Sequence, residues 1–240
     1  PARGGSKGIP RKNLRILGRY PLIAYSIAAA RQSNLVTRTI VSTDDEEIAS
    51  VASQYGAEVP FMRPAELAYD DTPDYPAFKH ALDWLSDHED YRPDIIVQLR
   101  PTSPFRSSGI VDDSVGLLLS DPKADCVRGV VVSSQNPYKM WRMNCEGYMR
   151  PLLPDEFSES YNMPRQGLPT TYWQTGHIDV IRYETIITKG SLTGDLIRPF
   201  PIDRAYCVDI DSPKDWEQAE WILENSEVDI VLPESAANYS

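Results

Sequence analysis

Residues 94–99, Asp-Ile-Ile-Val-Gln-Leu, form a nearly continuous apolar run near the middle of the 240-residue chain. A short run of this kind is typical of a strand in a sheet that is covered on both faces. Segments with helical apolar spacing precede and follow it, for example 74–86 and 108–119. The run and its neighbours therefore predict an α/β fold.

Strand and helix patterns alternate through the first half of the chain. Strands are expected at 39–43, 57–60, 94–99 and 125–133, and helices at 21–30, 44–54, 74–86 and 108–119. Thr43 and Glu46 are expected to form a capping box at the start of the second helix. The alternation predicts a three-layer, mostly parallel sheet, which binds ligands at the carboxyl ends of its strands.

The composition of the sequence changes between 135 and 199, where prolines, glycines and aromatic residues dominate and short strands are expected around 139–143, 171–174 and 178–182. We interpret 135–199 as an inserted dimerisation and substrate lobe within one domain, 1–240, whose core comprises 1–134 and 200–226. A strand at 204–209 and a helix from Ser212 to about Glu224 are expected to complete that core. Ser212 suits the N-cap of the helix and Pro213 its first position.

The stretch Ala2–Asn13, ARGGSKGIPRKN, concentrates positive charge on a glycine-rich loop, although the chain carries a net charge of −11. That net charge disfavours nucleic acid and anionic membranes, so an anionic ligand has to be gathered by a local cluster of cations. Glycines let the backbone approach a phosphate, and Lys and Arg add charge-assisted hydrogen bonds. The P-loop and dinucleotide patterns are absent. The loop therefore predicts a triphosphate site with Arg3 and Lys12 near the phosphates; the alternative is a solvated basic loop.

Asp209 and Asp211 flank Ile210 at the end of the last expected strand. Alternate strand residues face the same way, so both carboxylates could share one hard cation, Mg²⁺ or Mn²⁺. The alternative is a strand-end aspartate beside a helix-capping one. The pair also resembles the Asp-x-Asp metal motif of glycosyltransferases, which leaves that class open, along with a non-catalytic nucleotide-binding protein.

Longer motifs resemble one family. They are Ala2–Leu14, Val41-Ser-Thr-Asp44, Arg63-Pro-Ala-Glu-Leu67, Pro101-Thr-Ser-Pro-Phe-Arg106, Arg165-Gln-Gly-Leu-Pro169 and Val208-Asp-Ile-Asp211. On these motifs the chain resembles the N-acylneuraminate cytidylyltransferases, or CMP-sialic acid synthetases, which activate a free sugar acid with CTP. The resemblance implies a Rossmann-like fold of the nucleotide-diphospho-sugar transferase type and a homodimer whose lobe closes over the partner's site.

The resemblance also implies roles for individual residues. Lys12, Arg3 and Asp211 would be catalytic, and Asp209 and Asp211 would bind the metal. The nucleotide would be held by Ala2, Arg3, Gly4, Ser6, Lys7, Lys12, Asn13 and Thr72. The acidic sugar would be held by Arg100, Thr102, Ser103, Arg165, Gln166, Thr175 and Asp179. From its residues alone, the turn 70–74 is interpreted as a solvated acidic turn that caps the next helix.

Two positions depart from the family. Arg100 stands where the family has Gln, and Thr175-Gly-His-Ile-Asp179 replaces Asn-Gly-Ala-Ile-Tyr. Arg100 and Asp179 could pair with each other. Because a guanidinium and a carboxylate change the acceptor pocket, the acceptor stays open: sialic acid, a related nonulosonic acid, another 2-keto sugar acid or a different acidic group.

Cys126, Cys145 and Cys207 are widely spaced, which indicates reduced thiols and a cytoplasmic protein. No apolar run approaches the roughly 20 residues of a membrane span, and no signal peptide is recognisable. Glycine-rich loops of this kind normally follow a strand, so we expect the native protein to have a strand before Pro1.

Overall fold

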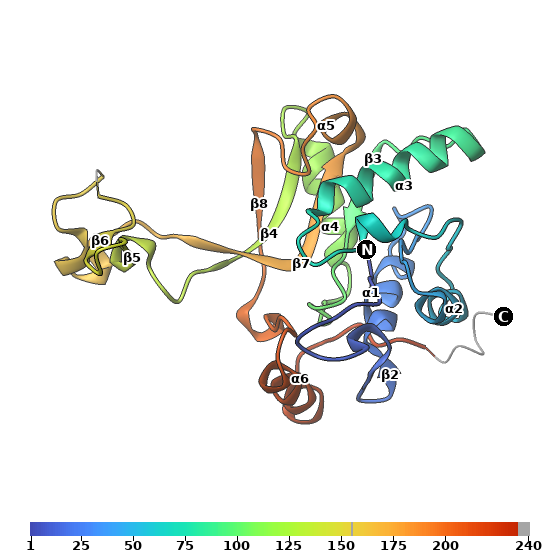
Figure 1. Cartoon of the computed structure of the whole chain (residues 1–240), viewed down its shortest axis with the longest axis horizontal. Coiled ribbons are helices and arrows are strands. Elements are labelled where there is room, and N and C mark those ends of the chain that lie inside the picture. The colour runs from blue at the N-terminus through green and yellow to red at the C-terminus, as the bar shows by residue number, and fades with distance from the viewer. Residues whose placement is uncertain (155, 235–240) are drawn as a thin grey trace.

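The structure is a computed structural model that describes residues 1–154 and 156–234 (Figure 1). Its helices are α1 (Leu22–Arg31), α2 (Glu46–Gln54), α3 (Asp74–Glu89), α4 (Ile110–Ser120), α5 (Tyr183–Ile187) and α6 (Pro213–Asn225). Short 3₁₀ turns lie at Lys12–Leu14, Ala65–Leu67, Pro137–Lys139, Ser160–Asn162, Arg165–Gly167 and Arg204–Tyr206. Within these described residues, no helix combines the length and the apolar character needed to cross a membrane.

A four-stranded sheet forms the centre of the molecule, in the order β3 (Ile95–Gln98), β7 (Tyr172–Arg182), β4 (Cys126–Val132) and β8 (Ile197–Pro201). β4 and β8 are parallel, whereas β7 is antiparallel to both β3 and β4. Three strands thus run in one direction and β7 runs against them. The sheet is therefore mixed, with three of its four strands parallel to one another, where the sequence predicts a mostly parallel sheet.

Helices cover both faces of this sheet, which makes the three layers. Val127 and Val180 pair across β4 and β7 and pack in one cluster with Leu118 of α4. Their neighbours Cys126 and Ile181 also pair, but they pack with α3 and α5 on the other face. This alternation is the period of two that a strand imposes on its side chains.

A third hydrophobic cluster joins the N-terminal region to the last helix. The hairpin of β1 (Ile16–Leu17) and β2 (Tyr20–Pro21) leads into α1, and α6 packs on it through the buried Trp216. The capping box at the start of α6 is present, because Ser212 and Asp215 satisfy each other's backbone N–H groups. The expected starts and types of α1, α3, α4 and α6 are confirmed within a few residues.

Three local expectations were wrong. The strands expected at 39–43 and 57–60 share only one parallel bridge, Ile40 to Glu58. The expected strand at 204–209 is a 3₁₀ turn followed by extended chain, because none of the described strands pairs with it. The cap of α2 is Asp45, whose carboxylate accepts hydrogen bonds from the N–H groups of Glu47 and Ile48; it lies two residues nearer the helix than Thr43.

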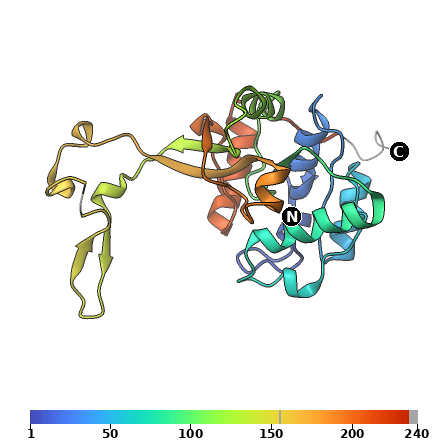
Figure 2. The ribbon, with the colours of Figure 1, turned by 90° about the horizontal axis from the view of Figure 1, so that it is seen from above.

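The segment interpreted as a lobe, 135–199, is divided between an arm and the sheet. The arm projects from the body and ends in a hairpin of β5 (Trp141–Met143) and β6 (Met149–Pro151) (Figures 1 and 2). Residues 172–182, however, form β7 at the centre of the sheet. The two short strands expected at 171–174 and 178–182 are one long strand, whose second half is buried between β3 and β4.

Candidate active site

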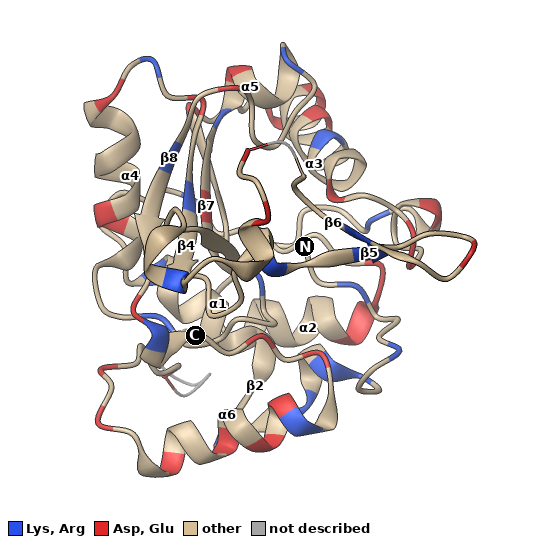
Figure 3. Ribbon diagram, turned by 90° about the vertical axis from the view of Figure 1, so that its left-hand side faces the viewer, with Lys and Arg blue, Asp and Glu red and all other residues tan. Residues whose placement is uncertain are grey.

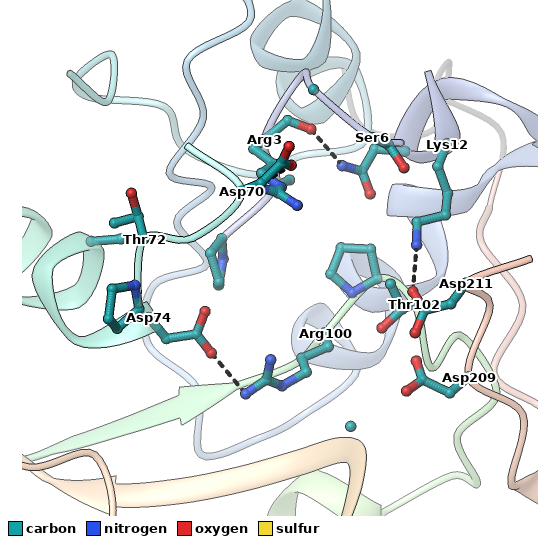
Figure 4. Close-up of a pocket in the computed structure, with 18 of the residues that line it drawn as sticks. Arg3, Ser6, Lys12, Asp70, Thr72, Asp74, Arg100, Thr102, Asp209 and Asp211 are labelled. Carbon is teal, nitrogen blue, oxygen red and sulfur yellow. Dashed lines mark hydrogen bonds and ion pairs between the residues drawn. The ribbon is translucent and has the colours of Figure 1, made fainter. Parts of the chain in front are cut away.

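A pocket of about 740 Å³ lies where β3 ends. Its walls come from the N-terminal loop, the turn 69–74, the segment 100–102 after β3, residues 173–176 of β7 and the Asp209/Asp211 pair (Figure 4). The carboxyl end of a strand is the place where α/β sheets bind ligands, as the sequence predicts. Charged side chains of both signs line the pocket. Figure 3 shows where residues of each sign lie along the ribbon of the whole chain.

The cationic loop and the aspartate pair touch each other directly. The Lys12 ammonium donates hydrogen bonds to the backbone oxygen of Ile210 at 2.6 Å and to Oδ1 of Asp211 at 2.9 Å. Lys12 is only 8% exposed, so its side chain forms part of the pocket wall. The N–H of Ile210 donates to the backbone oxygen of Thr102 at 2.8 Å, which ties the same segment to the turn after β3.

Gly8 allows this close approach. A Cβ at Gly8 would lie 2.0 Å from the backbone oxygen of Asp211, whereas a Cβ at Gly5 would meet nothing within 4 Å. We therefore expect Gly8→Ala to reduce the free energy of unfolding by about 1–3 kcal/mol through overpacking, measured by urea denaturation. Gly5→Ala is the matched control and should change it by less than about 0.5 kcal/mol. Equal stabilities for the two variants would contradict the contact.

Asp209 and Asp211 lie on one side of an extended segment. Val208 and Ile210 are buried, whereas the two aspartates are exposed and line the pocket (Figure 4). Within the described ranges no group of three or more His, Cys, Asp or Glu side chains forms a ready-made metal site. Two carboxylates nevertheless suit a hard cation such as Mg²⁺, which takes its remaining oxygens from substrate phosphates and water. The pair therefore fits a metal that arrives with a nucleotide.

Hydrogen bonds within the loop set its shape. The Asn13 amide donates to the backbone oxygen of Arg3 at 3.0 Å, and the N–H of Gly4 donates to Asp44 at 2.9 Å. Ala2, Arg3, Ser6, Lys12 and Asn13 line the pocket. Gly4 and Lys7 do not line it, and Lys7 reaches the pocket only through its contact with Asp70.

The turn 70–74 differs from the interpretation made from its residues. Pro73 precedes α3 and no side chain caps that helix. Instead, Asp70 forms ion pairs with Arg3 at 2.9 Å and Lys7 at 2.6 Å, and Asp74 pairs with Arg100 at 2.8 Å. The hydrogen bond from Lys7 and the charge of Arg3 hold the pKa of Asp70 below its usual value. Thr72, expected near the nucleotide, lines the pocket.

Residues 1–139 match the cytidylyltransferase family, and several relatives are similar over most of the chain. The chain belongs to the cytidylyltransferase family. It is 33% identical to CMP-N,N'-diacetyllegionaminic acid synthase of Legionella pneumophila over 230 residues, covering 93% of the chain and 94% of that protein. It is 32% identical to N-acylneuraminate cytidylyltransferase of Escherichia coli over 91% of the chain, but spans only half of that relative's length. The resemblance seen in the motifs is confirmed.

Solved structures share the fold of this cytidylyltransferase. One is a CMP:2-keto-3-deoxy-manno-octonic acid synthetase in complex with CTP, with a TM-score of 0.67 and 17% identity, covering 93% of the chain and 96% of that structure. Another is a 4-diphosphocytidyl-2C-methyl-D-erythritol synthase of Anaerococcus prevotii, with a TM-score of 0.61 and 10% identity, covering 89% of the chain and 93% of that structure. The Rossmann-like fold class is confirmed, and the chain is a nucleotidyltransferase, a class that uses a divalent metal.

One buried arginine of the pocket, Arg63, was missed from the sequence. Arg63 lines the pocket, is 6% exposed, and donates to the hydroxyl of Ser42 at 3.0 Å. Arg106 is fully buried and donates to the backbone oxygens of His177 at 2.7 Å and Arg100 at 3.0 Å. Burial lowers the pKa of Arg106 to about 9. Arg63 and Arg106 both lie in motifs of the family, and these motifs were the available signal. A motif does not, however, predict the direction in which a side chain points.

The residues expected to bind the sugar are only partly in the pocket. Arg100, Thr102 and Thr175 line it. Ser103 and Asp179 are 0% and 2% exposed and do not line it. The suggested pairing of Arg100 with Asp179 is wrong, because Arg100 pairs with Asp74.

Asp179 instead pairs with Arg128 at 2.7 Å, and burial raises the pKa of its carboxyl group. This pair forms between β7 and β4, where the two residues lie opposite each other. Arg165 and Gln166 lie on the projecting arm, and Arg165 donates to the backbone oxygens of Ser133 and Ser134. Within the described part of the chain, neither Arg165 nor Gln166 lines the pocket.

Proposed function

We propose that this enzyme transfers a cytidylyl group from CTP to the anomeric hydroxyl of an acidic sugar, giving a CMP-sugar and pyrophosphate. Sugar acids of the nonulosonic class are favoured, because the similar proteins are named as synthases of CMP-activated sialic and legionaminic acids. The observation that carries the proposal is the direct contact between the cationic loop and the aspartate pair in one pocket. One nucleotide can therefore reach both.

In the proposed reaction, the hydroxyl oxygen of the sugar attacks the α-phosphorus of CTP. The bond from that phosphorus to the bridging oxygen breaks, pyrophosphate leaves with the electron pair, and the hydroxyl proton passes to solvent. Arg3 and Lys12 would hold the phosphates and balance the charge that grows on them in the transition state. Within the described chain none of the three histidines lines the pocket, so we assign no histidine as the base.

We propose Asp209 and Asp211 as the ligands of Mg²⁺ or Mn²⁺. When bound, such an ion would neutralise phosphate charge and lower the pKa of a nearby hydroxyl. Lys12 would then change its role. In the structure it balances the charge of Asp211, and with a cation at Asp211 its ammonium would be released toward the α-phosphate.

The acceptor end of the pocket is proposed to lie around Arg100, Thr102 and Thr175. Arg100 offers a guanidinium whose planar donors match a sugar carboxylate. Thr175 is buried, and its hydroxyl has no hydrogen-bond partner among the described residues. Because Thr175 lines the pocket, a sugar hydroxyl bound there could form a hydrogen bond with its hydroxyl group.

We also propose a cytoplasmic homodimer. The projecting arm exposes large apolar side chains, among them Trp141, Met143 and Met149, and residues of this kind are common at subunit contacts. In a dimer the arm would bring Arg165 and Gln166 to the partner's pocket. This would explain why both lie away from the pocket of their own protomer.

Incubation with CTP, Mg²⁺ and a panel of sugar acids tests the function. We expect pyrophosphate to appear with at least one nonulosonic acid and not with neutral sugars. A glycosyltransferase acting on a sugar nucleotide would release no pyrophosphate, which separates that alternative. A different 2-keto sugar acid as the best acceptor would correct the acceptor class. Absence of pyrophosphate with every acid would contradict the proposal.

A further inference from the structure

The acidic turn 70–74 forms ion pairs that have no role in the proposed reaction. Asp70 bridges two cations of the loop, with its Oδ1 2.9 Å from Nη1 of Arg3 and its Oδ2 2.6 Å from Nζ of Lys7. At the other end of the turn, Asp74 pairs with Arg100. Asp70 and Asp74 both line the pocket (Figure 4). Cations that an anionic ligand would contact already face carboxylates of the protein itself.

The ion pairs of Asp70 are exposed to solvent, so another anion can replace Asp70 as the partner of Arg3 and Lys7. The side chain of Asp70 is 38% exposed, and those of Arg3 and Lys7 are 36% and 83% exposed. Exposed ion pairs contribute little to the stability of a fold. A triphosphate offers more negative charge and more acceptor oxygens than one carboxylate, so it can replace Asp70 at the same cations.

We propose that Asp70 is an internal anion that occupies Arg3 and Lys7 in the empty pocket and is displaced when a polyphosphate binds. The identity of the polyphosphate as CTP rests on the proposed function, but the displacement itself does not. Asp74 begins α3 and stays paired with Arg100, so only the first part of the turn has to move. Asp70 thereby weakens nucleotide binding and favours the release of pyrophosphate after the reaction.

Binding of inorganic tripolyphosphate, measured by calorimetry without metal, tests this inference. We expect Asp70→Asn to bind tripolyphosphate about three- to tenfold more tightly than the unmodified chain, since it no longer has to break two exposed ion pairs. The matched control is Asp71→Asn, which removes the same charge from the exposed neighbouring residue; its affinity should change by less than about twofold. High salt should shrink the gain, because these charges are exposed.

Equal or weaker binding by Asp70→Asn would overturn the inference, because Asp70 would then be holding the cations in place for the ligand. The same holds if neither protein binds tripolyphosphate, or if Asp71→Asn gains as much as Asp70→Asn. Pyrophosphate release from CTP, assayed in parallel, reports on the proposed function separately. Tighter tripolyphosphate binding without any turnover would leave the Asp70 inference standing and remove the proposed reaction.

Discussion

Replacing Lys12 with alanine is expected to lower kcat for pyrophosphate release by about 10²–10³-fold, the range found when one preorganised donor to a developing charge is removed. Lys12 is the buried cation of the pocket that lies on the loop and contacts the aspartate pair at the same time. The substitution removes both the charge proposed for the α-phosphate and the hydrogen bond to Ile210. Stopped assays of pyrophosphate with saturating CTP measure the effect.

Lys123→Ala is the control for this substitution, because Lys123 is an exposed lysine outside the pocket. Its kcat should stay within about twofold of the unmodified chain. Thermal unfolding of Lys12→Ala separates loss of chemistry from loss of fold. A folded Lys12→Ala protein that keeps more than a tenth of its kcat would show that Lys12 only joins the loop to the 209–211 segment.

Asp209→Asn is expected to lower the metal-supported rate by about 10²–10³-fold and to raise the Mg²⁺ concentration needed for half the maximal rate, since a bound metal supplies several kcal/mol of transition-state stabilisation. Asp209 is the better of the two aspartates to change. Asp211 also pairs with Lys12, so its substitution would disturb two parts of the site. A titration of activity against Mg²⁺ and Mn²⁺ measures both effects.

Asp87→Asn provides the comparison for Asp209→Asn. Asp87 is an exposed aspartate on α3 outside the pocket, and its loss should leave the metal titration unchanged. If Asp209→Asn shows the same metal dependence as Asp87→Asn, then the pair is not the metal site. Asp211 would then serve only as the ion-pair partner of Lys12.

The sequence predicted the elements whose signals are local. The N-cap of α6 depends on Ser212 alone, and it forms as expected, with Asp215 completing a capping box. Asp209 and Asp211 point to the same side because Val208 and Ile210, which alternate with them, are buried on the other side. The segment that carries the pair is extended, although it is not a strand. Side-chain alternation needs an extended backbone, not a sheet partner.

Features that depend on partners distant in the chain could not be predicted. β7 lies between β3 and β4, so the extent of this strand is set by two segments that lie at least 40 residues before it. Asp179 was expected to bind the sugar in the pocket, but its carboxylate forms an ion pair with Arg128 on the neighbouring strand. The partners of Asp70 lie more than 60 residues away on the N-terminal loop. Charges alone show that counter-ions are needed, and only the fold shows which residues supply them.

Anomalous diffraction from crystals grown with CTP and Mn²⁺ tests the central claim most directly, because it locates the metal and the nucleotide in one measurement. The account predicts a manganese peak about 2.2 Å from carboxylate oxygens of Asp209 and Asp211, with the triphosphate of the same CTP against Arg3 and Lys12. A manganese peak elsewhere, or a triphosphate that contacts neither Arg3 nor Lys12, would contradict it.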